Sequence, residues 1–137
     1  MFKKLMFIAG TLLGLSACQS ASLTGGEDLD ILGSWHIEAA QGKAVIDYSP
    51  AQLVFAEDGA LSGNNSCNQF FGQYQLEGQA LTLSPAGSTM KACVDALMQQ
   101  ERNVMQAMSQ VTQVKLVKGK LLLSDADGET QLVLSKQ

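Results

Sequence analysis

The amino-acid sequence predicts a mainly β (α+β) fold, in which an antiparallel sheet of hairpins carries one packed helix. From Gly33 onward, apolar and polar residues alternate with a period of two, which is typical of half-buried antiparallel strands. Turn pairs that contain glycine interrupt this alternation. Only residues 95–110 break the pattern, because they contain no Gly or Pro and are rich in Met, Gln, Ala and Leu, which favour helices.

The N-terminal residues have the layout of a cleaved secretion signal. Lys3 and Lys4 supply positive charge, residues 5–15 are mostly apolar, and small residues precede Cys18. A helix of about 13 apolar residues spans about 20 Å, too short for a hydrocarbon core of about 30 Å. We therefore predict that residues 1–17 are a signal peptide and not a transmembrane helix.

The signal peptide ends in Leu-Ser-Ala-Cys, which resembles the lipobox of bacterial lipoproteins. The resemblance implies that Cys18 becomes the acylated first residue of the mature chain and anchors it to the membrane, since several acyl chains hold firmly where one does not. In bacterial lipoproteins an Asp after the cysteine often retains the protein at the inner membrane, and Gln19 stands here instead. We expect an outer-membrane location, on the periplasmic face.

Behind the lipidated cysteine, residues 18–30 are small and polar and contain a Gly pair, so we predict a flexible tether. The folded domain then covers residues 31–137. About 120 mature residues suffice for one domain with one core.

The charge balance argues against nucleic acid as a partner. Without the two leader lysines, the mature chain has seven basic and thirteen acidic side chains, a formal charge of −6. Binding to phosphates requires clustered Lys and Arg, and the nearest approach to a cluster is Lys115, Lys118 and Lys120, which flank a turn. We expect the lipid at Cys18, and not a basic patch, to hold a monomeric protein at its membrane.

Apolar residues that share one strand face mark the successive strands. They are Trp35 and Ile37, then Leu53 and Phe55, then Phe70, Tyr74 and Leu76, then Leu81 and Leu83. Hairpin turns are predicted at Asp58-Gly59, Glu77-Gly78, Lys118-Gly119 and Asp127-Gly128, because Gly supplies the positive φ that tight turns need. A final three-stranded meander is expected from residues 114–117, 121–124 and 131–134.

The predicted helix over residues 95–110 begins at Asp95, which is placed as an N-cap. Its apolar arc consists of Leu97, Met98, Val104, Met105 and Met108, which would pack on the open face of the sheet. Glu101 falls inside this arc. Because a buried, unpaired charge is costly, its carboxylate must reach solvent or find hydrogen-bond donors.

Two motifs resemble the META domain, also called the HslJ-like domain. Residues 63–74 read Gly-Asn-Asn-Ser-Cys-Asn-Gln-Phe-Phe-Gly-Gln-Tyr, and residues 88–93 read Ser-Thr-Met-Lys-Ala-Cys, ahead of a helix with Glu101. The resemblance covers about residues 31–135 and implies a barrel-like antiparallel sheet with one packed helix. Ser66 stands where the family usually has Gly, and Asn64 and Asn65 can adopt left-handed geometry nearby.

The resemblance also bears on function. Members of the family are linked to heat shock, to novobiocin resistance and to virulence in trypanosomatids, and no enzymatic activity, cofactor or ligand is established for them. We therefore expect a non-catalytic lipoprotein, without a cofactor, that acts in envelope stress or maintenance by binding an envelope protein or component. The alternatives are a carrier of a small amphipathic ligand in the barrel mouth, an enzyme acting on an envelope polymer, or an assembly factor with an exposed apolar patch.

Cys67 and Cys93 form an even pair once Cys18 carries lipid, and in an oxidising compartment such a pair predicts a disulfide. The loop closure would be worth roughly 3.5 kcal/mol in the chain-entropy model. Redox or metal chemistry is the first alternative, although there is no CxxC spacing and His36 is the only histidine. Two separate buried thiols are the second alternative.

No catalytic or metal-binding pattern emerges elsewhere. His36 is predicted on the opposite strand face from Trp35 and Ile37, as an exposed imidazole without a partner. No Gly-x-Ser-x-Gly elbow occurs. Residues 125–129 resemble the start of a calcium loop but lack its remaining ligands, so a hairpin turn explains them better.

Glu101 is the most notable acid because of its position. We predict a structural latch, in which its carboxylate accepts hydrogen bonds from backbone amides or hydroxyls of residues 64–68, or of Ser88 and Thr89. The alternative is a general acid with a raised pKa. The latch is favoured, because the sequence places no second carboxylate beside it.

Overall fold

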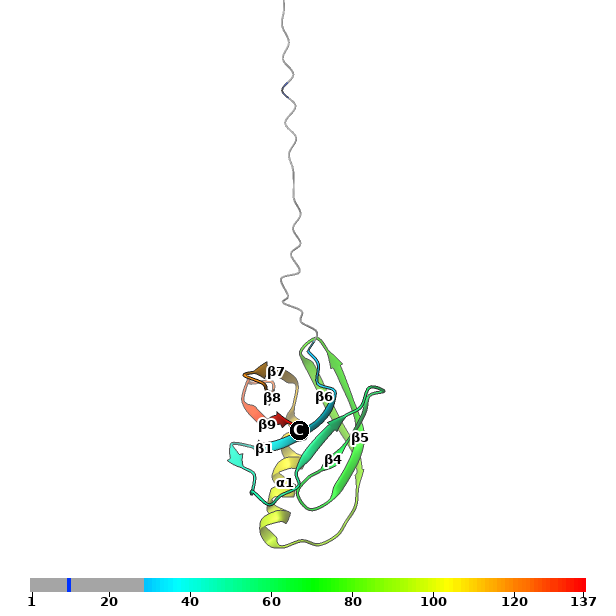
Figure 1. Ribbon diagram of the computed structural model, residues 1–137, viewed down its shortest axis with the longest axis vertical. Coiled ribbons are helices and arrows are strands. Elements are labelled where there is room, and N and C mark those ends of the chain that lie inside the picture. The colour runs from blue at the N-terminus through cyan, green and yellow to red at the C-terminus, as the bar shows by residue number, and fades with distance from the viewer. Residues whose placement is uncertain (1–9, 11–28) are drawn as a thin grey trace, which may run out of the picture.

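The computed structural model describes Gly10 and residues 29–137 (Figure 1). The predicted signal peptide, Cys18 and the tether up to residue 28 lie outside the described residues, apart from Gly10. Within the described part, the chain forms nine antiparallel strands and one α-helix. This is the mainly β architecture that the sequence predicts.

The strands and the helix follow one another along the chain with short connections. Their bounds are β1 (Gly33–Ala40), β2 (Lys43–Ala44), β3 (Gln52–Phe55), β4 (Ala60–Asn64), β5 (Gln69–Glu77), β6 (Ala80–Ser88), α1 (Asp95–Gln110), β7 (Gln113–Val117), β8 (Lys120–Ser124) and β9 (Thr130–Lys136). The last three strands are the predicted C-terminal meander. Their hairpin turn at Lys118 and Gly119 has positive φ at both residues, 53° and 81°, as a two-residue type I′ turn requires.

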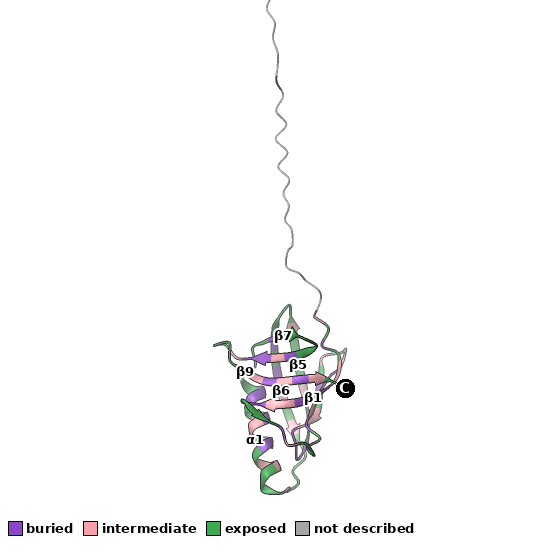
Figure 2. Cartoon of the chain, turned by 60° about the vertical axis from the view of Figure 1, so that its left-hand side comes forward, coloured by how far each residue is buried: buried purple, intermediate pink, exposed green. Residues whose placement is uncertain are grey.

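The sheet closes into a barrel-like ring because β1 pairs with β3 on one edge and with β9 on the other. The remaining strands pair with their neighbours in chain order, while β2 pairs only with the end of β1. In Figure 2 the strands β7, β9 and β1 cross β5 and β6 at a steep angle. Closure satisfies most backbone groups that an open sheet would leave at its edges.

The ring is weakest between β6 and β7, where the register contains a single pair, Ala80 with Gln113. In the sequence, α1 connects β6 to β7. In space, it packs against β9, β1 and β6. The helix covers the lower end of the barrel in Figure 1. Its bounds agree with the prediction, and no helix among the described residues is long and apolar enough to cross a membrane.

Two details of the helix differ from the prediction. Val94 is the N-cap and makes no side-chain capping bond, so Asp95 belongs to the first turn, where its charge still suits the positive end of the helix dipole. The fully buried face is also rotated from the predicted arc. The buried helix residues are Gln100, Val104, Ala107 and Met108, whereas Leu97, Met98 and Met105 are only half-buried.

The first described residues of the domain, 29–32, lie at the end of the barrel opposite α1 (Figure 1). Ile31 is 2% exposed, and its carbonyl oxygen accepts a hydrogen bond from Nε1 of Trp35 at 2.8 Å. Leu29, which we assigned to the tether, packs against the core. The packed segment thus begins before the predicted domain boundary, and the core lies between this segment and α1.

Candidate functional site

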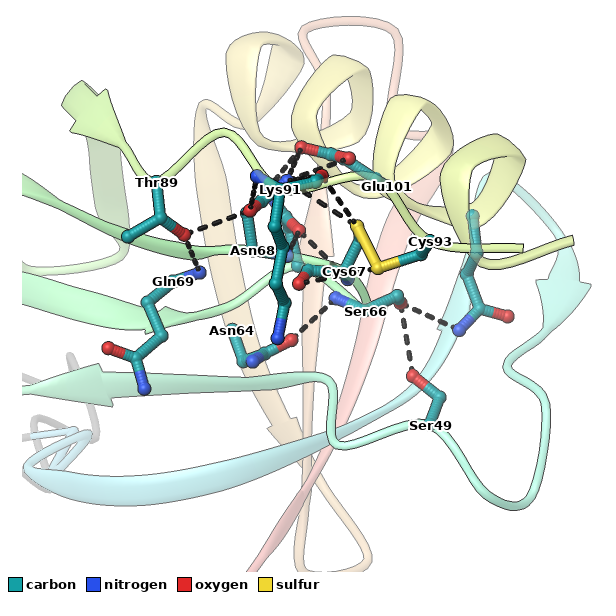
Figure 3. Close-up of a disulfide and its surroundings, with 12 residues drawn as sticks. Ser49, Asn64, Ser66, Cys67, Asn68, Gln69, Thr89, Lys91, Cys93 and Glu101 are labelled. Carbon is teal, nitrogen blue, oxygen red and sulfur yellow. Dashed lines mark hydrogen bonds between the residues drawn. A yellow bond between two sulfur atoms is a disulfide. The ribbon is translucent and has the colours of Figure 1, made fainter. Parts of the chain in front are cut away.

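Cys67 and Cys93 form a disulfide, as predicted, with Cα atoms 5.9 Å apart. The bond joins the turn after β4 to the segment before α1, and Figure 3 shows it beneath the helix. Cys67 is 1% exposed. Because both sulfurs are in the bridge, the alternatives of two separate thiols and of a thiol-based redox or metal site do not apply to this structure.

The turn between β4 and β5 is held by its own side chains. Oδ1 of Asn65, a fully buried residue, accepts hydrogen bonds from the backbone amides of Cys67 and Asn68 at 3.2 and 2.8 Å. Oδ1 of Asn64 accepts one from the amide of Ser66 at 2.8 Å. Such local bonds replace the ladder bonds that end with the strand, which is why Asn is favoured in turns.

Asn68 connects this turn to the second motif. Its Oδ1 accepts hydrogen bonds from the hydroxyl of Thr89 at 2.9 Å and from the amide of Lys91 at 2.8 Å. Its Nδ2 donates to the carbonyl of Lys91 at 3.2 Å. The two sequence motifs, about twenty residues apart, therefore form one hydrogen-bonded unit (Figure 3).

Glu101 reaches this unit from α1. Its Oε1 accepts hydrogen bonds from Nδ2 of Asn65 at 3.1 Å and from Nδ2 of Asn68 at 3.3 Å. The carboxylate contacts the turn that we expected, but the donors are side-chain amides and not backbone amides or hydroxyls. The geometry is that of a latch between helix and turn, and the effect of removing it remains a prediction.

A second branch, which the sequence analysis missed, centres on Gln100. Its Nε2 donates to Oγ of Ser66 at 2.7 Å, and its Oε1 accepts from the amide of Ile46 at 2.8 Å. The hydroxyl of Ser49 also donates to Oγ of Ser66, at 3.0 Å. The sequence did hold one indication that Gln100 is buried: it lies four residues before Val104 and therefore on the same face of the helix.

Ser66 adopts a φ of 108°, a conformation that L-residues rarely take. Asn64 and Asn65 are residue types that can adopt left-handed geometry, but neither has a positive φ here. Ser66 occupies the position where the META family usually has Gly, and it keeps the conformation that Gly would favour. Its hydroxyl compensates for part of this strain, because it is the shared acceptor for Gln100 and Ser49.

We call this assembly the polar cluster. It consists of the disulfide together with Ser49, Asn65, Ser66, Asn68, Gln100 and Glu101. Its hydrogen bonds join the β4–β5 turn, the segment before α1, the helix itself and the loop after β2. The hydrogen-bond partners of Glu101 in the described chain include no histidine and no second acid, and no group of three metal-ligating side chains occurs among those residues. The hydrogen bonds of Glu101 and Gln100 tie the helix to the turn.

Comparison with known proteins agrees with the motifs, since residues 27–137 match the META domain. The chain belongs to the META domain family. A search of curated proteins finds no match.

Solved structures share the META fold. A protein solved by NMR is 26% identical, with a TM-score of 0.58 over 75% of this chain and 87% of that one. An NMR structure of a Burkholderia xenovorans protein is 24% identical, with a TM-score of 0.59 over 77% and 81%. A crystal structure of a DUF4847 family protein from Bacteroides vulgatus is 13% identical, with a TM-score of 0.56 over 77% and 92%. The last two support the fold alone.

The other predicted candidates lie away from the polar cluster in the META domain. His36, which we predicted to be exposed, is half-buried, and it lies on the opposite face of β1 from its buried neighbours Trp35 and Ile37, as predicted. The carboxylate of Asp125 accepts hydrogen bonds from the amides of Asp127 and Glu129 at 2.9 and 3.0 Å. The bond from Glu129 is the main cause that lowers the pKa of Asp125. The supposed calcium loop is therefore a hairpin turn.

The barrel interior is filled by side chains, and the hollows that we describe open on the surface. Leu53, Leu121 and Leu134 in the interior are each 0% exposed. A hollow of about 570 Å³ lies beside residues 29–32 and includes Tyr74. Burial, followed by the nearby carboxylates of Asp58 and Glu57, raises the pKa of Tyr74, whose hydroxyl donates to the carbonyl of Ala56 at 2.6 Å. A second hollow, of about 400 Å³, lies outside β3 and β4.

The first prediction concerns the disulfide. Alkylation of the oxidised protein, before and after denaturation, should leave Cys67 and Cys93 unmodified until a reductant is added. Reduction should lower the free energy of unfolding by about 3.5 kcal/mol, because the reduced unfolded chain is less constrained. Peptide mapping by mass spectrometry and urea unfolding check both points, with Cys67→Ala/Cys93→Ala as the control. Alkylated Cys67 and Cys93 in the unreduced, denatured protein would contradict the bridge.

The second prediction uses two substitutions at one strained position. Ser66→Ala should lower the free energy of unfolding by about 2 kcal/mol, because buried Gln100 loses its acceptor while the strained φ stays. Ser66→Gly loses the same hydroxyl but relieves the backbone, so it should be more stable than Ser66→Ala by about 1 kcal/mol. Urea unfolding measures both variants. Equal stability of the two would show that the backbone at Ser66 carries no strain.

The third prediction tests the latch. Glu101→Gln should change stability by less than about 1 kcal/mol, because an amide oxygen can still accept from Asn65 or Asn68. Glu101→Leu should destabilise by about 1 kcal/mol or more, because Nδ2 of buried Asn65 loses its acceptor and Nδ2 of Asn68 keeps only the carbonyl of Lys91 as an oxygen acceptor. Arg102→Leu, on the exposed side of the same helix, is the control for adding Leu. The latch is wrong if Glu101→Leu is as stable as the wild type.

Proposed function

We propose that this META domain protein is a lipoprotein of the bacterial outer membrane, anchored by an acylated Cys18 with its domain in the periplasm. The Leu-Ser-Ala-Cys sequence at the end of an apolar leader supports the anchor, and Gln19 supports the outer membrane. The Cys67–Cys93 disulfide suits an oxidising compartment. These observations come from separate parts of the chain and point to one location.

We infer that the protein is non-catalytic and works by binding a protein or another component of the envelope. The observation that carries this inference is the polar cluster, because the polar side chains of the family motifs are used inside the fold. Asn65, Asn68 and Glu101 bond to one another, and among the described residues none of them has a second acid or a histidine as a hydrogen-bond partner. The family's links to heat shock and novobiocin resistance favour a role in envelope stress or maintenance.

The alternative of a carrier with an amphipathic ligand inside the barrel receives no support from the described interior, which is filled by Leu, Ile, Val and Phe side chains. An assembly factor would require a contiguous apolar surface. In the part of the chain that the structure describes, the large apolar side chains that are exposed come instead from several separate elements. They are Leu32, Tyr48, Phe71, Met90, Val94, Leu116 and Val117.

The fourth prediction tests the location. Cys18→Ser should move the protein from the membrane fraction to the soluble fraction, because it removes the lipid. The Cys67→Ser/Cys93→Ser double variant is the matched control, and any of it that survives should stay in the membrane fraction. Cell fractionation followed by immunoblotting measures this. Firm membrane attachment of Cys18→Ser would contradict lipid anchoring.

Gln19→Asp refines the same experiment. It keeps the acylated cysteine but should redistribute the protein from the outer to the inner membrane, which a density gradient separates. Crosslinking in intact cells, with wild type and Cys18→Ser compared, then identifies the bound component. An unchanged gradient position of Gln19→Asp would contradict the proposed sorting.

A further inference from the structure

The strands β3, β4, β5 and β6 contain a single charged residue, Glu77, at the last position of β5. The other side of the barrel differs, since β7, β8 and β9 carry Lys115, Lys120 and Lys136. Side chains that point outward from β3–β6 are mainly amides and hydroxyls. We call this surface the neutral face, and its polar residues include Gln52, Ser62, Asn64, Gln69, Gln73 and Ser84.

The neutral face is hollowed over β3 and β4. The hollow has a volume of about 400 Å³, and Gln52, Ser62, Asn64 and Gln69 line it. The strand register places these side chains together, because Asn64 is opposite both Gln52 and Gln69. Amide and hydroxyl groups can each donate and accept hydrogen bonds, so the lining suits a ligand that is rich in hydroxyls.

An exposed aromatic ring stands beside this hollow. Phe71 is 61% exposed and lies opposite Ser62 on one side and Gly87 on the other. A Cβ atom at Gly87 would be 2.7 Å from Cζ of Phe71, so the ring lies over the glycine. The glycine supports one side of the ring, and the exposed remainder offers an apolar platform. An aromatic face carries negative charge density that attracts polarised C–H groups.

We propose that the neutral face binds an uncharged glycan, with one sugar ring on Phe71 and neighbouring hydroxyls bonded to the amides of the hollow. This rests on the proposed binding role and names the class of envelope component. Anionic polymers fit poorly, because β3–β6 have no cationic side chain and the mature chain has a formal charge of −6. A protein partner is less well matched, because interface cores usually gather several aromatic or Arg anchors, and this face has one.

The test titrates neutral tetrasaccharides into the ¹⁵N-labelled full chain with Cys18→Ser, which is free of lipid. The panel consists of β-1,4-linked N-acetylglucosamine, glucose and galactose tetramers, and a galacturonate tetramer is the anionic control. At least one neutral tetramer should shift the amide signals of Ser62, Gln69 and Phe71, and should bind at least ten times more tightly than the galacturonate tetramer.

Variants then assign the binding to the neutral face. Phe71→Ala should weaken binding at least tenfold, and Phe71→Trp should retain it. Because Phe71→Ala uncovers Gly87, the second variant is Gln52→Ala/Gln69→Ala, which leaves the ring in place and should weaken binding at least fivefold. Leu116→Ala removes an apolar side chain of similar exposure, 54%, from β7 and should change nothing.

Three results would overturn the proposal: no shifts with any neutral tetramer, shifts confined to other surfaces, or unchanged affinity in both the Phe71 and the double glutamine variants. None of them would affect the membrane attachment or the crosslinked partners, which are measured separately in cells. Failure of glycan binding can therefore be told apart from failure of the proposed location and binding role.

Discussion

The docking of α1 on the sheet depends on how the turn between β4 and β5 satisfies its polar groups at a buried site. Asn65 is fully buried, and Ser66, Cys67 and Asn68 are each less than 5% exposed. An unpaired buried polar group costs about 1–3 kcal/mol, and domains are stable by only about 5–15 kcal/mol. The turn is therefore compatible with folding only when α1 and the segment before it supply the missing partners.

That requirement bears on the position of the helix, which packs against β9, β1 and β6. Gln100 and Glu101 are adjacent in α1 but face two branches of the polar cluster, one toward Ser66 and one toward Asn65 and Asn68. The disulfide fixes the approach of the helix covalently. A satisfied network of this kind favours one docking position, because a shifted helix would leave several groups unpaired at once.

The sequence analysis predicted seven of the nine strands, the helix bounds and the disulfide, because each rests on local patterning or on a count; it did not identify β2 or β4. It failed where burial depends on a distant partner. Asp95 is of a residue type that favours the N-cap, yet Val94, with an extended backbone, occupies that position and Asp95 lies in the first turn. Gln100 reads as a polar surface residue, and its burial follows only from the positions of Ser66 and Ile46, more than thirty residues away. The sequence indicated that the turn supplies the hydrogen-bond donors to Glu101, but not which groups donate. Whether side chains or backbone amides of the turn face the helix depends on the turn's geometry, which the sequence does not show.

The division of the barrel surface is the feature that packing does not explain. Outward-facing positions on a closed sheet tolerate charge, as Lys120 with Glu38 illustrates on the opposite side, where the hydrogen bond at 2.7 Å lowers the pKa of Glu38. Nothing in the core requires β3–β6 to use amides and hydroxyls in place of charged side chains, since the inner residues of those strands carry the packing. Phe71 adds to the contrast, because an exposed aromatic ring lacks the burial that usually favours it. Stability therefore accounts for the polar cluster, whereas it leaves the composition of β3–β6 unexplained, and that composition is the observation on which the proposed glycan contact rests.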